Sequence, residues 1–173
     1  MSASTAALSG TNFRRIDIDQ YDEDRVTPAS LYHPDPRAPA QQLADAQQTD
    51  RTARGHVQRG DNLAALKELT REGNWPYGED DVAETKQAKS VALSSVLAVL
   101  NSTRSTDIPA LIQGLEPHEQ VTLMKYLYKA MESLGSDPNT QASGNVVLGW
   151  HEKLVETAGI GCIVKVLSDR RRV

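Results

Sequence analysis

Cysteine is almost absent from this 173-residue chain, and long apolar runs are missing altogether. The only cysteine, Cys162, cannot form a disulfide within the chain, and its apolar neighbours predict a buried thiol. No apolar run approaches the roughly 18 to 20 residues that a membrane-spanning helix needs. The first ten residues lack the basic and apolar regions of a signal peptide. We therefore expect an intracellular protein with no membrane partner.

An excess of positive charge is also missing. The net charge is −4 at pH 7, with 24% charged and 39% hydrophobic residues. This balance is typical of an ordinary globular protein, and it gives no reason to expect nucleic acid or an anionic membrane as a partner. A chain of this length predicts one domain with an extension.

Catalytic and metal-binding motifs are incomplete wherever they begin. HEKLV at 151–155 and HEQVT at 118–122 start like the H-E-x-x-H zinc motif, but each lacks the second histidine. DIDQYDED at 17–24 matches a calcium loop at only two positions. The G-x-G at 159–161 has neither a preceding strand nor a third glycine. We expect no enzyme activity, no metal and no cofactor.

Large apolar side chains are rare in residues 1–40, which contain four prolines. Such a segment cannot bury enough apolar surface to offset the entropy of ordering it, so we expect an extended or disordered N-terminal segment. Within it, Ile16 and Ile18 alternate with Asp17 and Asp19 at the period of two that strands show.

Helical periodicity dominates from residue 41 onward. The predicted fold class is all-α, with a body at 41–173 of about seven helices arranged as a bundle or as a superhelix of helix pairs. Asp61 and Asp137 are expected to cap the second and the sixth helix, and NWPYGEDD at 74–81 is expected to be a loop. The predicted helices cover 41–58, 61–73, 82–100, 107–114, 117–134, 138–158 and 160–171.

The helix expected at 117–134 is apolar over more than half of its circumference, which indicates packing on two sides. It is either a central core helix or a helix with one side against another chain. Tyr126 shares the spacing of Thr122 and Ser133 on its polar face. An aromatic side chain there is either incidental or an interface anchor.

Three further positions near the end of the sequence attract attention. Trp150 lies in line with Val147 and Leu154 and is expected in the core. His151 lies at an apolar edge, either as a structural histidine or as an interface donor. The arginines of SDRRRV are expected in the last turn of a helix, where they interact with the helix dipole or with an acidic partner. The candidate partner-binding residues of the body are Lys125, Tyr126, Lys129, His151, Arg170, Arg171 and Arg172.

Three segments carry a family resemblance when taken in order: NFRRIDIDQYDED, LMKYLYKAMESLG and WHEKLVETAGIGCIVKVLSDRRRV. Together they resemble the family of subunit 5 of the actin-related protein 2/3 complex, its smallest subunit. The likeness covers residues 13–24 and about 57–173. The Pro-rich SLYHPDPRAP segment and the NWPYGEDD loop depart from the family pattern.

The resemblance implies a non-catalytic subunit of an assembly that nucleates branched actin filaments. It implies an α-α superhelix that docks on subunit 4 close to subunit 1, and an N-terminal tail that tethers the actin-related protein 2 subunit. Actin filaments are then an indirect partner, and the location is the cytoplasm, at cortical actin structures. The tail residues that match the family motif are Phe13, Arg14, Arg15, Ile16, Asp17, Ile18, Asp19 and Tyr21. The alternative is a free-standing helical-repeat adaptor that binds short peptides.

Overall fold

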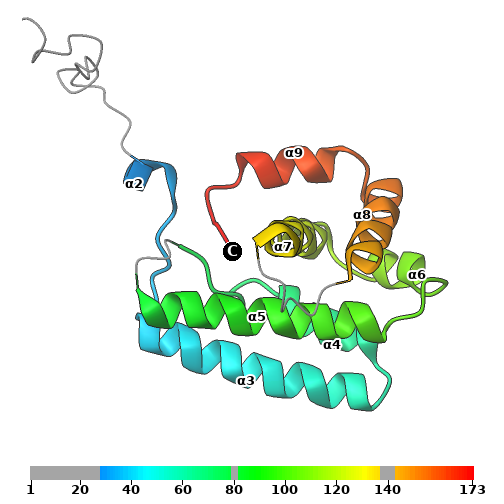
Figure 1. Ribbon diagram of the computed structural model, residues 1–173, viewed down its shortest axis with the longest axis horizontal. Coiled ribbons are helices and arrows are strands. Elements are labelled where there is room, and N and C mark those ends of the chain that lie inside the picture. The colour runs from blue at the N-terminus through cyan, green and yellow to red at the C-terminus, as the bar shows by residue number, and fades with distance from the viewer. Residues whose placement is uncertain (1–27, 79–81, 137–142) are drawn as a thin grey trace, which may run out of the picture. The chain divides into compact units, whose positions relative to one another are not determined.

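The computed structural model describes residues 28–78, 82–136 and 143–173. The chain divides into two compact units, Met1–Leu31 and Tyr32–Val173. Within the first, the structure describes only the short helix α2 (Pro28–Leu31). The second is all-α, as predicted, and no strand occurs in any of its described parts (Figure 1). The described residues of this unit form seven helices: α3 (Pro39–Gln58), α4 (Asn62–Thr70), α5 (Ala83–Ser102), α6 (Ile108–Gln113), α7 (Pro117–Ser136), α8 (Gly144–Ala158) and α9 (Gly161–Ser168).

Small side chains explain why α3 forms a stable helix despite its weak apolar pattern. Its buried positions are Gln42, Ala46, Thr49 and Ala53, which share one face at a spacing of three and four residues. The facing helix α5 also buries small residues, and α3 and α5 run side by side (Figure 1). Small side chains let α3 and α5 approach closely, so that van der Waals contact between the helices stabilises α3 in place of large apolar side chains.

The beginning of α4 confirms a predicted cap. The Oδ1 atom of Asp61 accepts a hydrogen bond from the backbone N–H of Ala64 at 3.0 Å. This bond satisfies one of the backbone donors that the first helical turn leaves unpaired. The helix then buries Leu66 and Leu69 in the core.

Helix α7 is the central helix of the body. It contacts α4, α5, α8 and α9, and Figure 1 shows it nearly end-on between these elements. Leu123, Met124 and Leu127 are fully buried. The prediction of a core helix packed on more than one side is confirmed. Trp150 of α8 is also in this core, as expected, and its indole N–H donates to the carbonyl of Leu100 at 3.4 Å.

Several helix boundaries differ from the predictions by a few residues, and those of α7, α8 and α9 change the interpretation of the sequence. Helix α7 continues past Gly135 to Ser136. Helix α8 begins at Gly144 after Ser143 in an extended conformation, so a single helix from Pro138 is wrong; residues 137–142 lie outside the described part of the chain. Helix α9 ends at Ser168, and residues 169–173 are not helical. Long-range contacts of these last residues, described below, replace the predicted helical turn.

Candidate functional site

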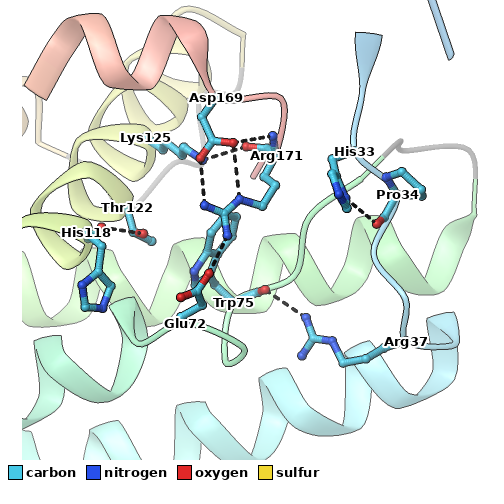
Figure 2. A network of polar contacts seen from close by, with 10 residues as sticks. All are labelled: His33, Pro34, Arg37, Glu72, Trp75, His118, Thr122, Lys125, Asp169 and Arg171. Carbon is cyan, nitrogen blue, oxygen red and sulfur yellow. Dashed lines mark hydrogen bonds and ion pairs between the residues drawn. The ribbon is translucent and has the colours of Figure 1, made fainter. Parts of the chain in front are cut away.

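Residues 169–173, which follow α9, are held against α7 by a buried lysine (Figure 2). Lys125 Nζ donates to Asp169 Oδ2 at 2.7 Å and to the carbonyl oxygen of Arg171 at 2.9 Å. The Lys125 side chain is only 5% exposed. Its charge is therefore compensated by one carboxylate and one carbonyl from the same short segment.

Asp169 is the centre of this polar network. Arg171 donates to it through its backbone N–H at 3.0 Å and through its guanidinium at 3.2 Å. Burial opposes ionisation of Asp169, but the hydrogen bonds from Lys125 and Arg171 outweigh it and lower its pKa to about 2. Burial lowers the pKa of Lys125, and the bond to Asp169 offsets this only in part. Arg171 also pairs with Glu72 at 2.9 Å.

Trp75 packs under this network. The residue is 3% exposed, and the Lys125 Nζ atom lies 4.7 Å from the centroid of its ring. The guanidinium of Arg171 lies 5.4 Å from the same ring. The aromatic face carries partial negative charge and attracts each of these cations, which offsets part of the repulsion between them.

Residues 32–37 attach to the same region through Arg37 (Figure 2). Its guanidinium donates to the carbonyls of Gly73 at 2.8 Å and Trp75 at 2.9 Å. It also pairs with Asp35 at 2.6 Å, and the hydrogen bonds between them lower the pKa of Asp35 against the opposing effect of burial. Part of the segment that we expected to be tether, from Tyr32 onward, therefore makes contacts with the body.

A groove of about 510 Å³ lies beside Trp75, between α7 and α9. Its walls carry negative charges from Glu72 and Asp169 and positive charges from Lys165 and Arg171.

In the parts of the chain that the structure describes, no three His, Cys, Asp or Glu side chains are grouped to hold a metal ion. Over the same residues, no helix is long and apolar enough to cross a membrane.

The polar face expected around Tyr126 is not a surface. Tyr126 is 2% exposed, and its hydroxyl has no hydrogen-bond partner among the described residues. Burial raises the pKa of this hydroxyl above its ordinary value. Thr122 and Lys125 on the same side of α7 are buried as well. The prediction that Tyr126 lies on an exposed polar face is therefore wrong. Lys129 is more exposed than Lys125, and it pairs with Glu132 at 3.1 Å.

The other candidate residues of the body lie in two places. His151 Nε2 is 3.3 Å from the Tyr128 hydroxyl, and the two rings meet edge to face. The helix-dipole interpretation of the three arginines is wrong, because α9 ends before them. Arg170 has an exposed side chain, whereas Arg172 donates to the Tyr32 hydroxyl at 3.1 Å. The tail candidates at 13–21 lie outside the described residues.

The sequence did not predict that Trp75, Arg37 and Asp169 take part in a polar network. One signal was available for Trp75, because a large aromatic residue in an otherwise polar loop often packs onto the body. No local signal points to Arg37 or Asp169, since their partners are distant in sequence.

An exposed apolar face lies on α9 and its neighbour. Ile160, Val164 and Leu167 share one side of the helix at a spacing of four and three residues, and they are 73%, 59% and 80% exposed. Leu148 of α8 is also exposed. Most other large apolar side chains of the described body are buried in the core or packed against it, so this α9 face is typical of a surface that another protein covers.

A helical body with an exposed apolar face is typical of a protein that binds other proteins. The family model for the ARP2/3 complex 16 kDa subunit (p16-Arc) matches residues 12–173. The chain belongs to this family, which confirms the resemblance seen in the sequence.

Relatives match along nearly their whole length. Actin-related protein 2/3 complex subunit 5 of Saccharomyces cerevisiae is 36% identical over 164 residues, which cover 94% of this chain and 98% of the relative. Subunit 5-C of Xenopus laevis is 34% identical over 161 residues, covering 93% and 94%. The subunit 5-like protein of Homo sapiens is 32% identical over 163 residues, covering 94% and 95%.

Proposed function

We propose that this chain is a non-catalytic structural subunit of the actin-related protein 2/3 complex, which nucleates branched actin filaments. The observation that carries the proposal is the family match over residues 12–173, because it includes the tail motif as well as the helical body. The place of action is the cytoplasmic actin cytoskeleton, at cortical actin structures.

The helical body is the anchor in this proposal. It docks on subunit 4 close to subunit 1, and the α9 face supplies a surface for docking. Each of Ile160, Val164 and Leu167 contributes on the order of 1.5 to 3 kcal/mol if a partner covers it fully. A partner can cover this face without any change in the buried core of the body.

The N-terminal tail is the tether. Phe13, Ile16 and Ile18 supply apolar area for binding the actin-related protein 2 subunit, while Arg14, Arg15 and the acidic residues set orientation. A tail attached to an anchored body raises the effective concentration of its binding motif at that neighbour. Binding therefore holds the neighbour close without a large rigid interface.

Native size-exclusion chromatography of a cell extract tests membership in the complex. We expect the chain to elute with the other subunits, far above its own mass of 18.9 kDa. A free-standing adaptor would elute near its own mass, and this result would contradict the proposal. Mass spectrometry of the co-purifying chains then identifies the neighbours.

A further inference from the structure

Two segments from opposite ends of the second unit lie against each other. The backbone N–H of His33 donates to the carbonyl of Arg170 at 3.1 Å. The Arg172 guanidinium donates to the Tyr32 hydroxyl at 3.1 Å and lies 5.4 Å from the centroid of the Tyr32 ring. One backbone bond and one side-chain contact therefore join residues 32–33 to residues 170–172.

The 169–173 segment is itself firmly attached to the body. Lys125 binds its beginning through Asp169, and the N–H of Gly78 donates to the carbonyl of Arg172 at 3.1 Å. Val173 is buried at the end of the segment. These contacts come from α7 and from the loop that precedes α5, so the segment is a fixed support for residues 32–33.

Residues 32–37 are also held by contacts further along the segment. The His33 ring meets the Tyr77 ring edge to face, with centroids 6.3 Å apart, and the Tyr77 backbone forms a hydrogen bond with the Asp35 carboxylate. Without the contacts to 170–172, the first residue held to the body by a hydrogen bond would be Asp35 instead of Tyr32. The stretch of chain between the tail motif and this residue would then lengthen from ten residues (22–31) to thirteen (22–34). Effective concentration falls with roughly the −3/2 power of linker length, which predicts a decrease of about 1.5-fold.

We propose that the 169–173 segment fixes the point where the N-terminal tail leaves the body, and thereby sets the free length of the tether. The contact itself stands on the geometry above, while its consequence for the tether rests on the proposed function. Tyr32 and Arg172 are positioning residues in this account, because they act through the tail motif and not on a partner.

Hydrogen–deuterium exchange of the full chain tests the contact. Arg172→Ala removes the bond and the ring contact to Tyr32, and we expect the His33 amide to exchange about five- to tenfold faster. Arg170→Ala is the matched control, since it removes the same charge from an exposed side chain, and it should leave this rate unchanged. Tyr32→Phe, which keeps the ring and loses the hydroxyl, should give an intermediate rate. Equal rates in all of the variants would overturn the proposal.

Branching by the reconstituted complex tests the consequence. Arg172→Ala and Tyr32→Ala remove the same contact from its two sides, so each should lower branching by about 1.5-fold and the double variant should lower it no further. Faster His33 exchange with unchanged branching would overturn the claim about tether length. It would leave membership in the complex untouched, because co-elution of the chain reports on that separately.

Discussion

Lys125 Nζ and Asp169 Oδ2 lie 2.7 Å apart and join the central helix α7 to the segment that follows α9. The two residues are 44 positions apart in sequence. Because the lysine is almost completely buried, this pair differs from a surface ion pair in what its loss costs. A buried charge without its counter-ion destabilises the fold more than the pair itself stabilises it.

Removing one charge of the pair should therefore lower the free energy of unfolding more than removing both charges. We expect Lys125 to be left uncompensated in Asp169→Asn, with a loss of about 1 to 3 kcal/mol in the free energy of unfolding. Adding Lys125→Met should recover part of this loss. Urea unfolding of the full chain, followed by circular dichroism, measures the three variants. Additive effects of the two substitutions would contradict a direct interaction.

Acid should weaken the fold through the same carboxylate. The pKa of Asp169 is about 2 in the folded chain, below its ordinary value of 3.8. Its contribution is therefore fully present above about pH 4 and is lost as the pH falls towards 2. That contribution is on the order of 1 to 2 kcal/mol after allowance for solvent screening.

Thermal unfolding between pH 5 and pH 2 measures this dependence, with Asp169→Asn as the comparison. The melting temperature of the variant should fall less steeply over this range. Residual dependence in the variant is expected from Asp35, whose pKa is also lowered. Identical slopes for the two proteins would rule out Asp169 as a source of acid sensitivity.

The turn between α8 and α9 depends on a glycine. Gly159 has φ 75° and ψ 171°, a conformation that side chains with a Cβ atom rarely adopt. Since no atom beyond the two neighbouring residues lies within 4 Å of a Cβ placed there, backbone strain alone predicts that Gly159→Ala costs about 1 to 3 kcal/mol. Gly161→Ala, at an equally open site without positive φ, is the control and should be neutral or stabilising. Equal melting temperatures for both variants would contradict this explanation.

The α9 face should matter for assembly and not for folding. Val164→Glu with Leu167→Glu places two charges on exposed positions, so the free energy of unfolding of the isolated chain should change by less than about 1 kcal/mol. We expect the same variant to be lost from the complex in co-purification. Lys165→Glu, exposed on the same helix, tests for a general effect of negative charge. Normal recovery of the double variant with the complex would show that another surface anchors the body.

Local sequence signals predicted most of the helices correctly, for physical reasons that differ between elements. Helix α7 has enough apolar residues around its circumference to reveal its central place. Asp61 predicts the beginning of α4 correctly, because an N-cap bonds only to the first turn of its own helix. Helix α3 was a weak prediction, since Ala46 and Ala53 pack by close approach and add little to an apolar pattern.

The polar network could not be predicted in the same way. Arg37 reaches the carbonyl of Trp75 across 38 positions, and Arg171 reaches Glu72 across 99. Such contacts depend on where the helices place the loops, which no local pattern encodes. For the same reason Tyr126 looked like a surface residue: the segments that bury its side of α7 come from distant parts of the chain.

Branching by a complex reconstituted with a chain that lacks residues 1–25 tests the division between anchor and tether most directly. The account predicts that the shortened chain still co-purifies with the other subunits, while branching falls by at least about tenfold, because the tail motif no longer raises the effective concentration at its neighbour. Full branching activity with the shortened chain in place would contradict the tether.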